Sequence, residues 1–108
     1  MVPDAISLID DAGQSTPRHV PPGNVRIWLT GVAGKDLRVE ICVDYNPSPE
    51  DPADINPGTW ISAHPDLINI TDDFAGEPLL GNMFIRIQPN GGDMVGVKAY
   101  AVRCGGRR

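Results

Sequence analysis

Apolar and polar residues alternate with a period of two along several segments of this 108-residue chain. The longer segments cover residues 25–30, 37–43, 83–88 and 95–102, and two shorter ones cover residues 60–63 and 67–71. Successive side chains of a β-strand point to opposite faces, so this period predicts strands with one buried face. No stretch of ten or more residues has the 3.6-residue apolar period of an amphipathic helix. We therefore expect an all-β fold: a single antiparallel β-sandwich, jelly-roll or immunoglobulin-like, with roughly six to eight strands.

Turn-forming residues separate these segments at positions 31–36, 78–81 and 89–92. The alternation also predicts which side chains face the interior of the sandwich. The expected core residues are Val25, Ile27, Leu37, Val39, Ile41, Val43, Ile85, Ile87, Val95 and Val97.

The first 23 residues differ from the rest of the chain. Ile6, Leu8 and Ile9 could add one strand, but residues 13–23 are mostly glycine, proline and polar residues, with little apolar surface to bury. We therefore divide the chain into an extended N-terminal arm, residues 1–23, and a β-sandwich domain, residues 24–108. A segment of this composition does not order itself, so its order is expected to come from contacts with neighbouring chains.

A proline-rich loop, residues 46–58, interrupts the strand pattern. The stretch VDYNPSPEDPADINPGTW, residues 43–60, holds four of the chain's eleven prolines. Proline restricts the backbone and has no N–H group, so such a loop loses little entropy on docking and does not pair with strand edges. We predict that the loop is a contact arm and not the lid of an active site.

The sequence offers no group of residues suited to catalysis or metal binding. Its two histidines, His19 and His64, have no partner at a metal-ligand spacing. The acidic groups at 10–11, 50–54 and 72–73 do not match a calcium-binding loop. Cys42 and Cys104 are expected to be reduced thiols, and whether they pair is left open. We therefore predict a protein that is not an enzyme and that binds no cofactor or metal.

Charge and hydropathy restrict the partners. The formal net charge is −5, which disfavours a nucleic-acid duplex, because phosphate binding requires clustered lysine and arginine. No apolar run approaches the roughly 20 residues that span a bilayer. The acidic N-terminal residues 1–13 lack the basic character of a secretion signal, so we expect no export and no membrane partner.

Four aromatic residues allow an alternative role. Trp28, Tyr45, Trp60 and Tyr100 could stack on sugar rings, as in carbohydrate-binding modules, or could pack within the sandwich. Coplanar rings that face solvent would favour sugar binding, and buried rings would disfavour it. An exposed Trp28 would indicate an interface of some kind.

Two stretches of the sequence resemble a known family. The stretch RVEICVDYNP…GTW resembles a hairpin of the small β-sandwich structural proteins of tailed bacteriophages, in which an Asp ends one strand and a Trp begins the next. The stretch NMFIRIQPNGGDMVGVKAYA resembles the closing hairpin of the same domains. The resemblance covers residues 24–104 and matches Asp44, Trp60 and Arg86 to that pattern. The proline-rich residues 46–58 depart from it.

The resemblance implies a virion protein. It implies a non-catalytic capsid decoration (cement) protein that stabilises the major capsid lattice through its arm and loop. The alternatives are a head–tail connector or tail protein on the same scaffold, or a carbohydrate-binding β-sandwich module. The implied partners are other copies of the chain, as a homo-oligomer of which a trimer is one form, and the major capsid protein or neighbouring virion proteins. The implied location is the virion, assembled in the cytoplasm of the bacterial host.

The residues expected at these interfaces lie in the arm, on one strand and in the loop. They are Ile6, Leu8, Pro21, Pro22, Trp28, Tyr45, Pro47, Pro49, Pro52, Ile55 and Pro57.

Overall fold

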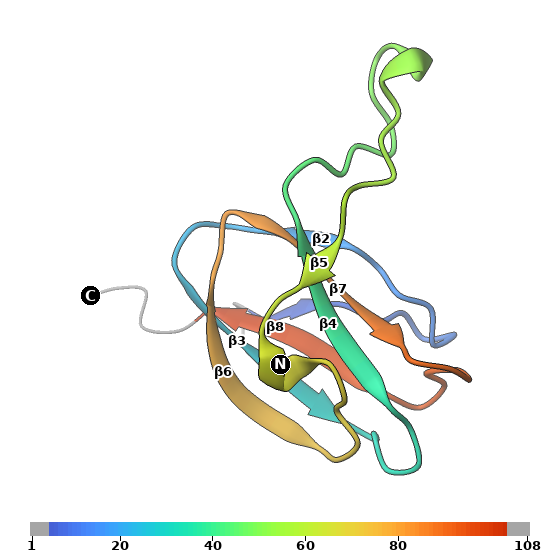
Figure 1. Cartoon of the computed structure of the whole chain (residues 1–108), viewed down its shortest axis with the longest axis vertical. Helices are drawn as coiled ribbons and strands as arrows, with labels where there is room; N and C mark the ends of the chain where they lie inside the picture. The colour runs from blue at the N-terminus through green and yellow to red at the C-terminus, as the bar shows by residue number, and fades with distance from the viewer. Residues whose placement is uncertain (1–4, 104–108) are drawn as a thin grey trace.

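The chain folds into two four-stranded antiparallel sheets packed face to face (Figure 1). A computed structural model describes residues 5–103, apart from the side chains of residues 77, 78 and 80. Two three-residue 3-10 turns, η1 (Pro52–Asp54) and η2 (Pro65–Leu67), are the helical segments of this range. The strands are β1 (Ala5–Ser7), β2 (Arg18–Val20), β3 (Asn24–Thr30), β4 (Leu37–Cys42), β5 (Ile61–Ser62), β6 (Phe74–Leu80), β7 (Met83–Pro89) and β8 (Lys98–Arg103). The predicted all-β sandwich is confirmed.

The strand order identifies the sandwich as a jelly roll. One sheet has the order β1-β8-β3-β6 and the other has the order β2-β7-β4-β5. The first strand thus pairs with the last, the second with the seventh, the third with the sixth and the fourth with the fifth. This is the pairing of one long antiparallel ribbon rolled into two sheets, the arrangement of jelly-roll domains.

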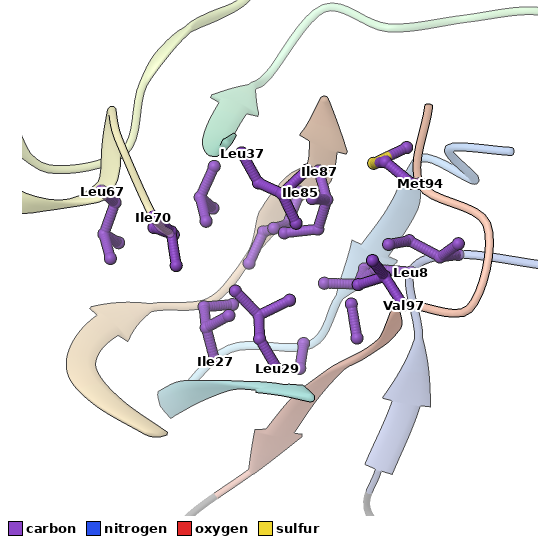
Figure 2. Close-up of a cluster of buried hydrophobic side chains, with 14 of the residues drawn as sticks. Leu8, Ile27, Leu29, Leu37, Leu67, Ile70, Ile85, Ile87, Met94 and Val97 are labelled. Atoms are coloured by element: carbon purple, nitrogen blue, oxygen red, sulfur yellow. The ribbon is translucent and has the colours of Figure 1, made fainter. Parts of the chain in front are cut away.

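The core lies between the two sheets (Figure 2). Side chains from β3 and β8 meet those from β4 and β7, as the period-two pattern predicts. Leu67 and Ile70 close one end of the core, and Met94 closes the other. Most of the predicted core residues are buried, and Ile41 is half-buried against the same cluster; the fully or almost fully buried ones are Val25, Ile27, Leu37, Val39, Ile85, Ile87 and Val97.

Two of the predicted core residues are exposed, so the prediction is wrong for them. Val43 is 82% exposed because β4 ends at Cys42, where the chain leaves the sheet to enter the proline-rich loop. Val95 is 61% exposed because β8 begins only at Lys98, and a turn closed by the Val97 N–H and the Met94 carbonyl (3.1 Å) precedes it. Within that turn Met94 takes the buried position.

The predicted N-terminal arm is part of the sandwich over residues 5–20. Strand β1 pairs with β8, and β2 pairs with β7, so this segment supplies an outer strand to each sheet. Leu8 and Val20 are completely buried, and the Leu8 N–H donates to the Ala99 carbonyl at 2.9 Å. The chain's own core therefore orders these residues, and neighbouring chains are not needed for it.

The region between β5 and β6 also differs from the prediction. The strand expected at residues 67–71 is reduced to one bridge, in which Ile70 and Leu37 exchange two backbone hydrogen bonds. Strand β6 was not predicted, because Gly76 and Pro78 interrupt its apolar pattern. Both residues are tolerated because β6 is an edge strand whose register with β3 shifts between Val25 and Ile27.

The burial of Leu8 leads to a stability prediction. Leu8→Ala leaves a cavity next to β8 and should lower the free energy of unfolding by about 2–5 kcal/mol. Val43→Ala, at an exposed position, should change it by less than about 0.5 kcal/mol. Urea unfolding followed by circular dichroism measures both values. Equal stabilities of the Leu8 variant and the wild type would contradict the placement of residues 5–20 in the core.

Candidate functional site

The proline-rich loop stands out from one end of the sandwich, between β4 and β5 (Figure 1). Its two legs are tied together at two levels. Near the sheet, the Asp44 carboxylate accepts from the Thr59 N–H (2.8 Å) and the Thr59 hydroxyl (3.0 Å). Further out, Asn46 and Asn56 exchange two backbone hydrogen bonds of 2.9 Å. The loop is therefore an internally braced projection.

Residues 47–55 form the tip of this projection. The side chain of Asp51 caps η1 by accepting from the Ala53 N–H at 2.9 Å, and the turn closes with the Ile55 N–H on the Pro52 carbonyl. Ile55 is 56% exposed, and Pro47 and Pro52 are exposed as well. The tip thus presents apolar side chains next to three carboxylates, those of Glu50, Asp51 and Asp54.

The base of the loop is held by Asp44. In addition to Thr59, this carboxylate accepts a hydrogen bond from the Cys42 thiol at 2.9 Å. The bonds from the Cys42 thiol and the Thr59 N–H lower the pKa of Asp44 from 3.8 to about 2. Burial and the same bond to Asp44 raise the pKa of the Cys42 thiol. Cys42 is therefore a protonated structural thiol and a poor nucleophile.

Trp60 fixes the return leg of the loop to the sheet. Its indole N–H donates to the Pro57 carbonyl at 2.8 Å, and the Arg86 guanidinium lies 4.2 Å from the centre of its ring. A side chain at Gly58 would place its Cβ 2.7 Å from the Trp60 nitrogen and 2.8 Å from the Cys42 sulfur. Glycine, which also has a φ of +91° here, is therefore required.

A row of aromatic rings covers the outer face of the β2-β7-β4-β5 sheet beneath the loop. His19 packs edge-on against Phe84, and Phe84 packs edge-on against Tyr45, with ring centres 5.2 and 5.3 Å apart. Tyr45 in turn lies 5.6 Å from Trp60. The row joins β2 and β7 to both legs of the loop, so the loop is anchored to the sheet by packing as well as by hydrogen bonds.

Next to Trp60, two arginines share one carboxylate. Glu40 on β4 receives Arg86 at 2.7 Å and Arg38 at 3.2 Å. Partial burial raises the pKa of Glu40, but the hydrogen bonds from Arg86 and Arg38 outweigh this effect and lower it overall. Arg38 also donates to the Pro89 carbonyl at 2.9 Å. These charges are engaged within the protein, and they hold Arg86 in place over Trp60.

The predicted interface residues fall into three groups: those of the proline-rich loop, those of β3 and the residues before it, and those of β1 and the residue after it. Pro47, Pro49, Pro52 and Ile55 come together at the loop tip, and Tyr45 and Pro57 lie in its base. Trp28 lies apart from them on the outer face of the other sheet, and Pro21 and Pro22 precede β3. The first two residues of the prediction belong to the sandwich itself: Ile6 is half-buried in β1, and Leu8 is fully buried, so the Leu8 side chain is not available to a partner.

Sequence reasoning did not identify the anchoring residues Phe84, His19 and Glu40. Phe84 and Glu40 have the outward orientation that the alternation of their strands predicts, whereas no strand is predicted around His19. The contacts of Phe84 with His19 and of Glu40 with Arg86 depend on the register of β7 with β2 and β4. Of these three residues, Phe84 could have been noticed in the sequence, because it is an aromatic residue on the polar face of a predicted strand.

The geometry does not favour a flat sugar-binding platform. The ring planes of Trp28 and Tyr100 are inclined by 47°, and Arg86 lies over the ring of Trp60. His64 caps η2, its Nδ1 accepting from the Asp66 N–H at 3.0 Å. Among the described side chains, no three of His, Cys, Asp or Glu converge as they would around a metal ion. Cys104, the possible partner of the free thiol Cys42, lies outside the described residues.

The lowered pKa of Asp44 predicts how stability depends on pH. Because the folded-state pKa lies below the unfolded value, the contribution of Asp44 is complete above pH 3.8 and is lost as the pH falls toward about 2. Asp44→Asn should therefore be less stable than the wild type near neutral pH, and the difference should shrink between these two values. Urea unfolding at a series of pH values measures it; a difference that is constant with pH would contradict the role of the carboxylate charge.

Within the described range, no helix is long and apolar enough to span a membrane. Comparisons of the chain with protein-family models, with curated protein sequences and with solved structures found no match.

Proposed function

We propose that this chain is a non-catalytic structural protein of a tailed-bacteriophage virion, in which it decorates the capsid and binds neighbouring subunits through the tip of its proline-rich loop. The observation that carries this proposal is the braced loop, residues 46–58, with its exposed prolines and Ile55. A head–tail connector or tail protein would use the same projection in the same way.

The construction of the loop suits binding to a macromolecule. Four prolines, the capped turn η1 and the Asn46–Asn56 bridge restrict its conformations before any partner arrives. A preorganised segment loses less conformational entropy on binding, so more of its contact energy becomes affinity. Since the tip projects beyond the sandwich, it can enter a recess of a partner that a flat sheet face would not reach (Figure 1).

Fold and sequence pattern support the virion as the setting. Jelly rolls are common in viral capsid proteins and also in lectins, so the fold alone is an analogy and not a proof of role. The resemblance of the β4–β5 hairpin to phage structural proteins favours the capsid. The closing hairpin expected at residues 82–101 is not formed, because β7 and β8 lie in different sheets, so that stretch adds no support. The inclined rings of Trp28 and Tyr100 and the Arg86 cover on Trp60 make a lectin role the weaker alternative.

Co-sedimentation with capsids tests the proposal. When the chain is added to particles assembled from the major capsid protein of the same genome, it should sediment with them and saturate at a fixed number of copies per particle. A loop-shortened variant, in which residues 47–55 are replaced by Asn-Gly, should bind at least about 10-fold more weakly, since it loses the central contact of the interface. Two residues suffice to join Asn46 and Asn56, because these form a hydrogen-bonded antiparallel pair.

The control is Ile68→Ser, which changes an exposed isoleucine of the sandwich outside the loop and should leave capsid binding unchanged. Wild-type protein that stays in the supernatant would count against the virion role. Equal binding by the wild type and the loop-shortened variant would count against the loop as the contact.

A further inference from the structure

The outer face of the β1-β8-β3-β6 sheet carries a second exposed aromatic site. Trp28 on β3 pairs across the strands with Tyr100 on β8, and their ring centres are 5.6 Å apart. Beside Trp28 lies an open hollow of about 240 Å³ with a mainly apolar lining. Its far wall is made by Ala75 and Gly76, and a Cβ placed on Gly76 would meet no atom within 4 Å. The small residues thus leave one side of the Trp28 ring open.

Two of the residues that line this hollow, Trp28 and Arg26, have side chains that donate hydrogen bonds. Neither the Trp28 indole N–H nor the Arg26 guanidinium has a hydrogen-bond or ion-pair partner among the side chains and backbone that the structure describes. Trp60 differs, since its N–H is bound to the Pro57 carbonyl. Trp28 is 40% exposed and Arg26 is exposed. An aromatic hollow with free N–H donors and one cation fits a ligand that is apolar, rich in acceptors and negatively charged.

The loop tip, residues 47–55, has these three properties. Its prolines have carbonyl groups but no N–H, so its backbone offers more acceptors than donors. Proline-rich segments bind aromatic grooves of this kind through their rings and carbonyls. Ile55 and Pro52 supply exposed apolar surface, and Glu50, Asp51 and Asp54 supply the charge opposite to that of Arg26.

We propose that the loop tip of one copy binds in the Trp28 hollow of a second copy of the same chain. The Trp28 indole N–H donates to a loop carbonyl, the apolar tip fills the space beside Ala75 and Gly76, and Arg26 pairs with a tip carboxylate. This inference deepens the proposed function, because it names the neighbour that the loop contacts.

The placement of the two surfaces requires contact between different copies. The tip extends away from the β4–β5 end of one sheet (Figure 1). The hollow is lined by residues of β3, β6 and β8, which belong to the other sheet. A pair joined by one such contact retains one free tip and one free hollow, so the contact is head-to-tail. It closes into a ring, such as a trimer, where the rotation between copies allows closure.

Complementation between two defective variants tests this arrangement. The loop-shortened variant keeps the hollow and loses the tip, and Trp28→Ala keeps the tip and loses the hollow. In sedimentation-velocity experiments without capsid protein, the wild type should associate with increasing concentration and each variant should remain monomeric. An equimolar mixture of the two should form a heterodimer and nothing larger, because it contains one usable tip and one usable hollow per pair.

Single substitutions test the individual contacts. Ile55→Ser and Trp28→Ala should each weaken association by about 30-fold or more, the loss typical of a central interface residue. Trp28→Phe keeps a ring but lacks the N–H, and Arg26→Ala, at an exposed position that the fold does not need, removes the cation; both should weaken it to a smaller degree. Ile68→Ser is the matched control for Ile55→Ser and should associate like the wild type. Circular dichroism and thermal unfolding confirm that each variant is folded.

The results separate this inference from the proposed function. A wild type that stays monomeric at all concentrations, or a mixture of the two variants that does not associate, would overturn the head-to-tail contact even if the protein binds capsids. Association by the same complementation without capsid binding would support the contact and count against the virion role.

Discussion

The pairing of β4 with β7 is the constraint on which the other features depend. These strands match over six residue pairs, from Leu37 with Pro89 to Cys42 with Phe84. Because side chains alternate across a strand, this one register has two consequences. It directs Val39 and Ile87 together into the core and Glu40 and Arg86 together onto the outer face. A slip of β4 by one residue would turn Glu40 toward the core, away from Arg86, and would expose the core side chains of β4 at the same time.

The stiffness of the loop follows from that register. Arg86 reaches the ring of Trp60 because Glu40, its neighbour across the strands, holds the guanidinium at 2.7 Å. Phe84 faces Tyr45 for the same reason, since Phe84 lies opposite Cys42 at the end of β4, next to the start of the loop. The sheet thus holds both legs of a projection whose tip has no core of its own. Packing at the base of the loop therefore stabilises the conformation of the tip before a partner binds.

The period-two pattern was sufficient to predict the fold class and the strands that carry the core, because burial of one face is a local property of each strand. The pattern failed to predict strands and exposures that depend on contacts with residues distant in the sequence. Residues 6–9 allowed one strand near β1, but β2 is too short to show a pattern. Both strands are ordered by pairing with β8 and β7, which lie more than 60 residues away in the sequence. Val43 and Val95 continue an alternation beyond the ends of their strands, where no opposing sheet remains to cover them.

The candidate site was predictable in part for the same reason. The tip is encoded locally by proline and acidic residues, so its protrusion could be expected from the sequence alone. Its anchoring could not, because His19, Phe84, Tyr45 and Trp60 come from four separate segments that only the strand register brings into one row. The hollow beside Trp28 likewise depends on Gly76, in a strand that the pattern does not predict.

The edges of the two sheets restrict how copies of this chain can associate. An open edge strand would recruit further strands through its unpaired backbone groups. Here β1 and β2 have three residues each and β5 has two. Strand β6 is longer but contains Pro78, which lacks an N–H, and its register is shifted by a bulge. Strand addition is therefore disfavoured at all four edges, and association is left to side-chain surfaces. The acidic, proline-rich tip and the aromatic hollow that Arg26 lines are two such surfaces with complementary chemistry, and they are the ones we propose to meet.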